Sequence, residues 1–401
     1  MNLHTGKLFW PHTYAEKVYP PLEEDVSCDV LIIGGGACGA HCAYFLGLAG
    51  ISTVLVEKRG IGGGSTSANT GLLQFCNDKT LTSFIHTLGE EKAVRFYTLC
   101  KQAVDQLGEI TATLPVYPDF VRRGSLYVAS READVPALHE EYMMLHKHGF
   151  AVEYMLDHHI RAKFPFTKSA AIYTHGDAEV NPFKLVHGLV GKAKEHGVRV
   201  YGNTEIVHHI QTEEGLVFWT KEKRQIRAKH AIFAPGYEGQ DIVKDKNAVL
   251  TSSYAVVTNT ISNMDSWYER CLIWETARPY LYMRTTVDNR IVIGGKDEVT
   301  IIPEKRDSML IHKRYELMSE LRMLFPAYEV EPEFYWSATF GSTHDGLPII
   351  GQYEGYENCY FLYGYGGNGT IYSVLFAQIV RDLITKGTHP HADLFLSTMR
   401  R

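Results

Sequence analysis

A glycine-rich turn between two short apolar runs constrains this chain more than any other stretch. The run Val30–Ile33 suits a buried parallel strand and ends at a glycine. A helix-like segment then extends to about Leu48, and a second apolar run, Thr53–Val56, ends in Glu57. The turn itself carries three glycines at G-x-G-x-x-G spacing, namely Gly34, Gly36 and Gly39.

Each part of this pattern suits the binding of a dinucleotide. The first glycine permits a tight turn, the second lets main chain approach a pyrophosphate, and the third lets the helix pack close to the strand. The helix N-terminus favours phosphate, and Glu57 can accept hydrogen bonds from ribose hydroxyls. The alternative is a glycine-rich turn that binds nothing. We predict cofactor contacts from Gly34, Gly36, Ala37, Cys38, Gly39 and Glu57.

A second unusual segment, KRGIGGGSTSANTGLL at positions 58–73, follows directly. Glycines and small hydroxyl residues can wrap closely around a ligand and offer N–H and O–H donors. A flexible loop is the alternative. An enzyme that binds only NAD through one Rossmann site has no need of such an arm, so the segment favours FAD. We expect contacts from Lys58, Gly64, Ser65, Thr66, Asn69, Thr70, Gly71 and Leu72.

A further glycine-rich loop, GYGGNGT at positions 364–370, precedes a helical pattern of apolar residues. A helix N-terminus there would stabilise the negative charge that reduction places near flavin N1 and the C2 carbonyl. Another tight turn is the alternative. Two anion-favouring sites in one chain suit a long cofactor such as FAD, with contacts expected from Gly366, Gly367, Asn368, Gly369 and Thr370.

Composition excludes several classes of protein. At 401 residues the chain can bury a large core, and two domains are expected. Its 45% hydrophobic and 21% charged residues are typical of a soluble enzyme, and a net charge of −6 does not suggest a nucleic-acid surface. The apolar stretch 30–50 is interrupted by glycines and follows acidic residues, so we predict neither a signal peptide nor a membrane span.

The cysteines and histidines indicate no further chemistry. Seven cysteines without a C-x-x-C argue against a disulfide framework and fit a reducing cytoplasm. Cys38 and Cys42 stand on the phosphate-binding helix, where small packing thiols are expected. The histidine pairs lack a complete set of ligands, so we predict no metal site.

Three further segments have interpretable patterns. Residues 1–27 are expected to form an extended arm on the surface, pinned by Trp10 and Tyr19, and an oligomer contact stays open. The stretch Asp177–Tyr201 predicts a helix capped by Asn181 and then a strand of the parallel sheet. An apolar strand before Gly236 ends in that glycine, which could leave room for the cofactor.

Residues 241–334 are expected to form antiparallel strands and one helix. Within ARPYLYMR, at positions 277–284, the period of two places Tyr280, Tyr282 and Arg284 on one face of a strand. That face could line a pocket, or it could be an exposed face of the sheet.

Together these motifs resemble the D-amino-acid oxidase family of FAD-dependent oxidoreductases, which includes glycine oxidase, sarcosine oxidase and gamma-glutamylputrescine oxidoreductase. Asp345 and Pro348 match the family's Asp-x-x-Pro before the second glycine-rich loop. The resemblance spans about residues 28–390 and implies that the main chain at Ile206, or at Val207, contacts the adenine. The family's pattern after the ribose-binding acid is matched by Ile61, Gly62, Gly64, Thr66, Asn69 and Gly71.

The chain departs from the family at one position. Amino-acid oxidases of the family have an arginine four residues after a tryptophan, where it clamps the substrate carboxylate, but here Trp336 is followed by Phe340. Either Arg284 or Arg278 supplies the clamp, or the substrate is an amine without an α-carboxylate. Residues 340–345 also lack the cysteine that tethers the flavin of sarcosine oxidase, so we predict non-covalent FAD.

The resemblance implies an α/β fold. A Rossmann-like FAD-binding domain with a parallel sheet would comprise residues 28–118, 177–240 and 335–401. A second, discontinuous substrate domain with an antiparallel sheet would comprise residues 119–176 and 241–334.

The predicted reaction is oxidation of the C–N bond of an amine or amino acid by hydride transfer to flavin N5, with O2 or another electron acceptor. We assign no catalytic base. The alternatives are an NAD-dependent dehydrogenase and a non-catalytic flavoprotein subunit. Candidate residues on the substrate side are Tyr254, Tyr280, Tyr282, Arg284 and His344.

Overall fold

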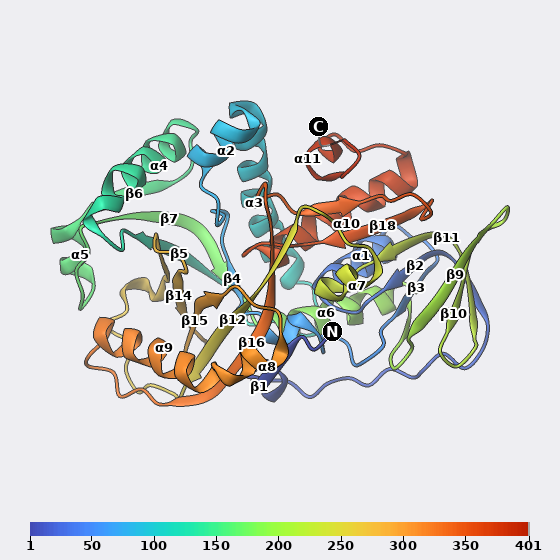
Figure 1. The fold of residues 1–401 in the computed structure, drawn as a ribbon, viewed down its shortest axis with the longest axis horizontal. Helices are drawn as coiled ribbons and strands as arrows, with labels where there is room; N and C mark the ends of the chain where they lie inside the picture. Colours follow the sequence, from blue (N-terminus) through green and yellow to red (C-terminus); the bar gives the residue numbers. More distant parts are fainter. Residues whose placement is uncertain (400–401) are drawn as a thin grey trace.

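The computed structural model describes residues 1–399 and contains two sheets, each with helices packed against it. Figure 1 shows the sheets in two lobes, with α3 between them. The predicted α/β fold, with a parallel cofactor sheet and a separate, largely antiparallel sheet, is confirmed. The helices are α1 Ala37–Leu48, α2 Leu81–Leu88, α3 Glu90–Thr111, α4 Val135–Lys147, α5 Asp157–Lys163, α6 Pro182–Glu195, α7 Gly239–Ile242, α8 Pro303–Ser308, α9 Leu310–Leu324, α10 Gly369–Lys386 and α11 Ala392–Phe395.

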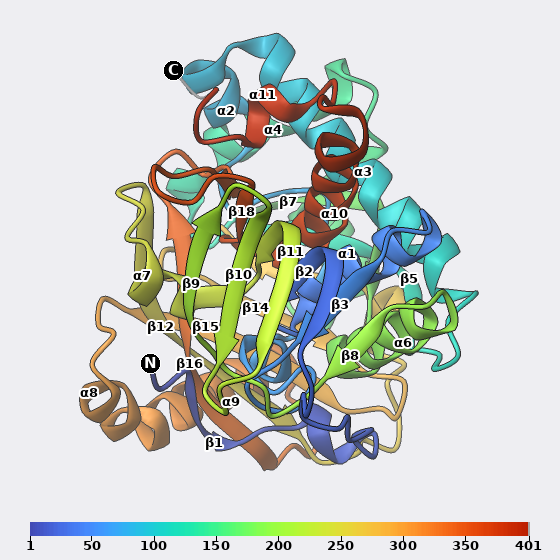
Figure 2. The same cartoon turned by 90° about the vertical axis from the view of Figure 1, so that its right-hand side faces the viewer.

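The first sheet has eight strands in the order β17-β18-β11-β2-β3-β8, with β9 and β10 continuing from β11. Its centre, from β18 to β8, is parallel. Figure 2 shows this sheet facing the viewer. Its strands are β2 Val26–Ile33, β3 Thr53–Val56, β8 Arg199–Tyr201, β9 Ile206–Thr212, β10 Gly215–Thr220, β11 Gln225–Phe233, β17 Ile349–Gly351 and β18 Cys359–Tyr363.

The unit β2–α1–β3 forms as its sequence predicts. Residues 30–32 and 54–55 are fully buried, as expected for central parallel strands. Most of α1 is buried because α6 and α10 pack on either side of it. A Cβ at Gly39 would overlap the carbonyl oxygen of Gly34, so only glycine allows the helix to approach the strand this closely.

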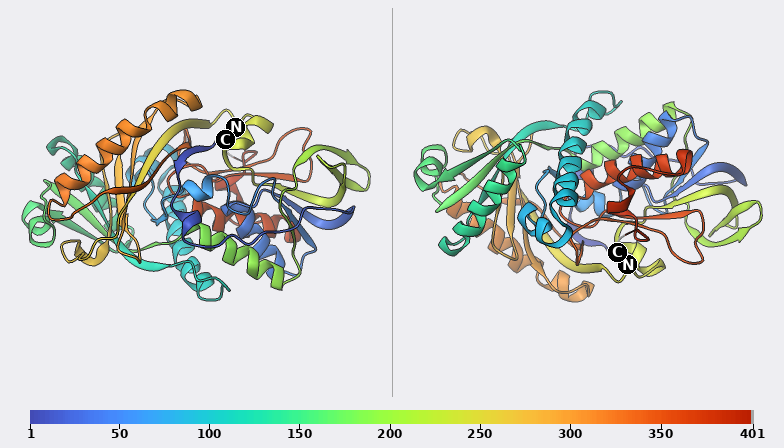
Figure 3. Two further views of the ribbon diagram at one scale, coloured as in Figure 1. Left: turned by 90° about the horizontal axis from the view of Figure 1, so that it is seen from below. Right: turned by 90° about the horizontal axis from the view of Figure 1, so that it is seen from above.

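The second sheet has ten strands in the order β1-β16-β12-β15-β14-β13-β5-β7-β4, with β6 on β7. All its pairs are antiparallel except β13 with β5. Helix α9 packs on one face of it, against β12, β15 and β16 (Figure 3). Its strands are β1 His4–Lys7, β4 Leu72–Leu73, β5 Val121–Val128, β6 Val152–Leu156, β7 Ala170–Glu179, β12 Ala248–Thr258, β13 Leu272–Glu275, β14 Leu281–Thr285, β15 Ile291–Glu298 and β16 Pro332–Thr343.

Segments from all three predicted regions enter this second sheet. The N-terminal segment, residues 1–27, supplies β1, which pairs with β16. The segment 58–73, which we call the arm or cofactor arm, supplies β4, which pairs with β7. The predicted boundary at residues 334/335 falls inside β16. The division into domains therefore stays a prediction, while the two sheets themselves are clear.

Local signals set several element boundaries. Asn181 caps α6, as expected, because its side-chain oxygen accepts hydrogen bonds from the N–H groups of Phe183 and Lys184 at 3.2 and 3.1 Å. The helical pattern from Thr80 to Leu114 forms two helices, α2 and α3, because Gly89 between them has a φ of +83°. Within residues 1–399, none of the helices has the length and apolar character that crossing a membrane requires.

Candidate cofactor and substrate site

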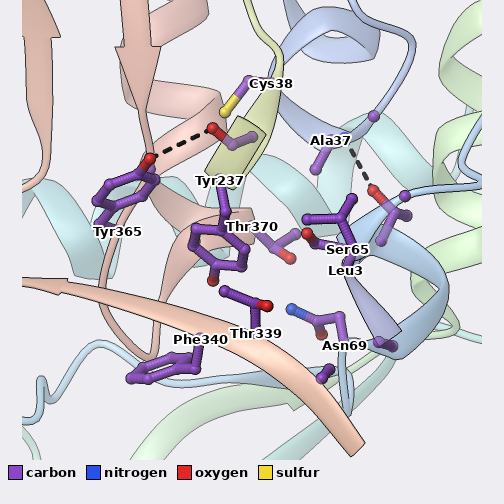
Figure 4. Close-up of a pocket in the computed structure, with 18 of the residues that line it drawn as sticks. Leu3, Ala37, Cys38, Ser65, Asn69, Tyr237, Thr339, Phe340, Tyr365 and Thr370 are labelled. Carbon is purple, nitrogen blue, oxygen red and sulfur yellow. Dashed lines mark hydrogen bonds between the residues drawn. The ribbon is translucent and has the colours of Figure 1, made fainter. Parts of the chain in front are cut away.

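A cavity of about 430 Å³ lies where the turns of the eight-stranded sheet meet the strands of the ten-stranded sheet. One side, which we call the cofactor side, is formed by residues within 33–38, 56–72, 204–206, 234–242 and 364–373. The opposite side, the substrate side, is formed by Asp78 and by residues of β12, β13, β14 and β16 with Tyr280. Figure 4 shows Asn69, Tyr237 and Thr339 gathered around this cavity.

Helix α1 begins at the cavity without a side-chain cap at Gly36. The N–H of Ala37 donates to the Thr66 hydroxyl at 3.1 Å, so the arm is held against the first turn of the helix (Figure 4). Helix α10 also begins at the cavity, and Asn368 gives it no side-chain cap. Two uncapped helix N-termini facing one cavity fit the phosphates and the ring carbonyl of FAD.

The Glu57 carboxylate lies at the cavity and orders the main chain around it. One oxygen accepts from the N–H of Gly35 at 2.7 Å, and the other accepts from the N–H of Arg59 at 2.8 Å. A carboxylate oxygen has more than one lone pair, so both oxygens keep capacity for ribose hydroxyls. The predicted contact with ribose stays a prediction.

Glu238 is a part of the site that sequence patterns missed. It accepts from Lys58 at 3.0 Å and from both terminal nitrogens of Arg59 at 2.9 and 3.0 Å. Burial opposes ionisation of Glu238, yet these hydrogen bonds hold its pKa below the ordinary value. About 180 positions separate it from its partners, so no local motif could have identified it.

The cofactor arm is held by two indole groups. Trp10 Nε1 donates to the Asn69 carbonyl, and Trp336 Nε1 donates to the Ala68 carbonyl at 3.0 Å. Asn69 Oδ1 in turn accepts from the N–H of Gly71 at 2.7 Å. The predicted role of Trp10 in pinning the N-terminal segment thus extends to the arm, and Trp10 and Tyr19 are both buried.

The second glycine-rich loop differs from its expected use. The N–H of Gly366 donates to the Gly341 carbonyl at 2.7 Å, and the N–H of Gly367 donates to the Asp78 carboxylate at 2.9 Å. The Asn368 side chain donates to the Cys76 carbonyl at 2.8 Å. These donors are already used, so the capacity to bind an anion rests with the start of α10.

Most predicted cofactor residues line the cavity, and a few support it from behind. Ile206 and Gly236 lie at the lining, whereas Val207 is exposed. Gly39 and Gly71 lie outside the lining, where their lack of a side chain permits close packing. The lining includes Gly34, Gly36, Ala37, Cys38, Glu57, Lys58, Gly64, Ser65, Thr66, Asn69, Thr70, Leu72, Gly366, Gly367, Asn368, Gly369 and Thr370.

The predicted substrate-side residues separate into two groups. Tyr254, Tyr280 and Tyr282 line the cavity, although the Tyr254 hydroxyl donates to the Arg306 carbonyl at 3.2 Å. His344 is exposed on the connection after β16, outside the lining. Arg284 is also outside it, on the far side of the arm.

The Arg284 guanidinium supports the arm from below. It donates to the carbonyls of Thr70 and Val180 at 2.7 and 2.8 Å, and it pairs with Glu179 at 3.7 Å. Burial lowers its pKa. A bound substrate would have to displace these contacts, so the structure offers no carboxylate clamp at Arg284.

Arg278, the other candidate clamp, is also engaged. Its guanidinium donates to the main-chain carbonyls of residues 275–277 and to the Asp78 carbonyl at 3.0 Å. Phe340 lies in the cavity lining at the position where family members have arginine. Among the lining residues of the described chain, Lys58 and Arg59 carry the cationic side chains, and both pair with Glu238 on the cofactor side.

The cysteines and the potential metal ligands can be located within residues 1–399. All seven cysteines are free thiols, and burial raises the pKa of Cys38 at the cavity. The Cys38 thiol lies 3.1 Å from the Ser373 hydroxyl, inside the start of α10. No cluster of three or more potential metal ligands occurs in this part of the chain.

Known proteins are similar to this chain in sequence and in fold. Gamma-glutamylputrescine oxidoreductase of Escherichia coli is 24% identical over 404 residues, which cover 98% of this chain and 92% of that protein. Glycine oxidase of Bacillus subtilis is 22% identical over 364 residues, covering 89% and 92%. The crystal structure of glycine oxidase from Geobacillus kaustophilus superposes with a TM-score of 0.74 at 21% identity, covering 90% of this chain and 95% of that one.

The comparison with protein families is decisive. The model of the family described as FAD dependent oxidoreductase matches residues 29–383, which is most of the chain. The matched segment includes the uncapped start of α1, the arm and the start of α10. The interpretation as an NAD-dependent dehydrogenase is therefore wrong, and the chain belongs to the family of FAD dependent oxidoreductases.

Proposed function

We propose that this oxidoreductase oxidises the C–N bond of an amine or amino acid to an imine, which water then hydrolyses. The observation that carries the proposal is that the cofactor side and an aromatic substrate side face each other across one shared cavity. The relatives named for glycine and gamma-glutamylputrescine support this class of substrate. Bound FAD supplies the hydride acceptor, flavin N5.

The chain's own residues bind the substrate and exclude water from it. Tyr280, Tyr282 and Trp274 line the substrate side with large rings. Burial raises the pKa of both tyrosines, so their hydroxyls stay protonated and act as hydrogen-bond donors rather than bases. A neutral amine can lose hydride without a protein base, and we assign none.

An anaerobic absorbance scan of the purified holoprotein tests this proposal. Amines and amino acids are added one at a time, and the flavin band near ~450 nm is followed. Bleaching by at least one compound is the expected result. A flavin that dithionite reduces but no compound of the panel bleaches would instead favour the non-catalytic flavoprotein.

Two further features belong to the proposal. The FAD is held without a covalent bond, because residues 340–345 contain no cysteine. Acid precipitation should therefore leave the flavin in the supernatant, and a yellow pellet would contradict it. The electron acceptor is O2 or another oxidant, and the rate of reoxidation in air-saturated buffer distinguishes the two. The predicted cytoplasmic location is part of the same proposal.

A further inference from the structure

Strand β15 carries one extra residue where it reaches the cavity. On β12, Tyr254 pairs with Gly295 of β15, and Ser252, two residues earlier, pairs with Glu298. The same interval therefore spans two residues on β12 but three on β15. Gly295 and Lys296 have φ values of +119° and +55°. Such a bulge turns the following side chains to the opposite face of the sheet.

The bulge places Asp297 on the cavity face. Neighbouring residues on a strand point to opposite faces, and Ser252 with its partner Glu298 points away from the cavity. Asp297 therefore shares the face of Ser253, which lines the cavity. Burial raises the pKa of Asp297, and a hydrogen bond from the Ser253 hydroxyl to its carboxyl group partly opposes this rise. Without the extra residue, Asp297 would point to the α9 side.

A second carboxylate approaches from the other direction. Asp78 follows the cofactor arm, lines the cavity and is fixed by the N–H of Gly367. It also hydrogen-bonds to Tyr280, and it is near enough to Asp297 to raise the pKa of that group. Within residues 1–399, Asp297 Oδ1 is buried and has no hydrogen-bond partner. An acceptor left in this state is costly unless a ligand supplies a donor.

Aromatic rings stand beside this pair. The rings of Tyr280 and Tyr282 are 5.7 Å apart at an angle of 48°. Tyr282 lies over Gly294, its partner across β14 and β15, where a Cβ would collide with the ring. The faces of such rings attract a cation, and the neighbouring carboxylates attract it through their negative charge.

The cations of the protein do not neutralise the pair. Arg278 stacks on Tyr280 at 4.9 Å and, like Asp297, lies just outside the residues that line the cavity, where it offsets one negative charge. Lys313, on α9, is paired with Glu298 at 2.6 Å and with Glu316 at 3.5 Å. Two carboxylates facing one engaged guanidinium leave net negative charge at the substrate side.

Resting on the proposed function, we propose that Asp78, Asp297 and the rings of Tyr280 and Tyr282 form a subsite for a cationic group of the substrate other than the reacting amine. The reacting nitrogen must be neutral to release hydride from its carbon, so the positive charge held here belongs to a second group. The substrate is accordingly a diamine or polyamine rather than a simple α-amino acid, whose carboxylate this surface would repel.

Three four-carbon compounds test the subsite: 1,4-diaminobutane, butylamine and 4-aminobutyrate, which end in a cation, a methyl group and an anion. The half-saturating concentration and limiting rate of anaerobic flavin reduction are measured for each with the holoprotein. We expect 1,4-diaminobutane to saturate at least ~10-fold below butylamine, and 4-aminobutyrate to saturate highest. Asp297→Asn should remove most of this preference by raising the half-saturating concentration of 1,4-diaminobutane towards that of butylamine.

Controls separate the subsite from general effects. Asp265→Asn removes an exposed carboxylate elsewhere and should keep the preference. If Asp297→Asn does not fold, Asp78→Asn serves as the second variant. Equal saturation by the three compounds, or a preference that survives both variants, would overturn the subsite while leaving the proposed function intact.

A panel that fails to reduce the flavin would count against the proposed function, and the subsite would still be tested by binding. Titration of the oxidised holoprotein with 1,4-diaminobutane should shift the flavin band at lower concentration than butylamine does. The same titration of Asp297→Asn should show no such difference. Equal curves for both compounds in the wild-type protein would overturn the subsite.

Discussion

The two sides of the cavity are built in different ways. The cofactor side consists mainly of three stretches, each a glycine-rich segment next to a helix or strand, with lining residues from 204–206 and 234–242 beside them. The substrate side combines residues from five separate strands or loops, and its shape depends on the register of β12, β14 and β15. Local chain geometry therefore shapes most of the cofactor side, whereas tertiary pairing shapes the substrate side.

The largest expected effect is on the cofactor side. Gly39→Ala should lower the free energy of unfolding by about 3 kcal/mol and abolish FAD retention, because the added Cβ overlaps the Gly34 carbonyl. Chemical denaturation and the flavin content of purified protein measure both effects. Gly50→Ala is the control from the same β2–α1–β3 unit, since its Cβ meets no atom and only its φ of +70° costs about 1 kcal/mol. Equal losses in the two variants would show that close packing is not what the turn requires.

The substrate side should show its own dependence on pH. Burial raises the pKa of Asp297 from 3.8 to about 6, with Asp78 adding to the increase and Ser253, Lys313 and Arg278 opposing it. The folded state binds this proton more tightly than the unfolded state, so the contribution to stability is present below about pH 4 and is lost as the pH rises through 6.

The size of this loss is about 2 kcal/mol, allowing for partial solvent exposure. Asp297→Asn cannot bind this proton. As the pH rises from 4 to 7, the melting temperature of the wild-type protein should therefore fall relative to that of the variant. Thermal unfolding of both proteins across this range measures the difference. Parallel profiles would mean that Asp297 is solvated and does not belong to a buried substrate side.

The difference between the two sides also explains what the sequence could predict. The strand–turn–helix pattern around Gly34, the arm and the helix after Gly369 follow from residues adjacent in the chain, and the structure brings them to one cavity. Asp78, Trp274 and Asp297 carry no local signal. Asp297 reaches the cavity face only through a bulge, which the period-two rule cannot anticipate.

The same rule accounts for the misplaced Arg284. It groups this residue with Tyr280 and Tyr282, and the two tyrosines do line the cavity. Arg284 stands further along β14, where the sheet passes beneath the arm and Gly71 leaves room for its guanidinium. Periodicity indicates which face of the sheet a side chain occupies. How far the cavity extends along that face depends on the segments that pack against it.

A smaller effect is expected from Glu57→Gln on the cofactor side. The amide nitrogen of glutamine would face the N–H of either Gly35 or Arg59, and the unpaired donor should cost about 1.5 kcal/mol. The dissociation constant of FAD, measured by flavin fluorescence with apoprotein, should rise about 10-fold. Glu205→Gln removes a charge from the same end of the cavity and should change it much less. A larger effect of Glu205→Gln would assign the role to net charge instead of to the ordered main chain.

The smallest expected effect concerns the link between the two sides. Trp10 and Trp336 each donate an indole N–H to the arm, one from the N-terminal segment and one from β16 of the second sheet. Trp10→Phe removes one hydrogen bond and keeps most of the buried ring, so it should cost about 1 kcal/mol and weaken FAD binding up to ~5-fold. Trp219→Phe, on β10 and away from the arm, is the matched control. If Trp10→Phe instead altered substrate saturation without changing FAD affinity, the arm would belong to the substrate side as much as to the cofactor side.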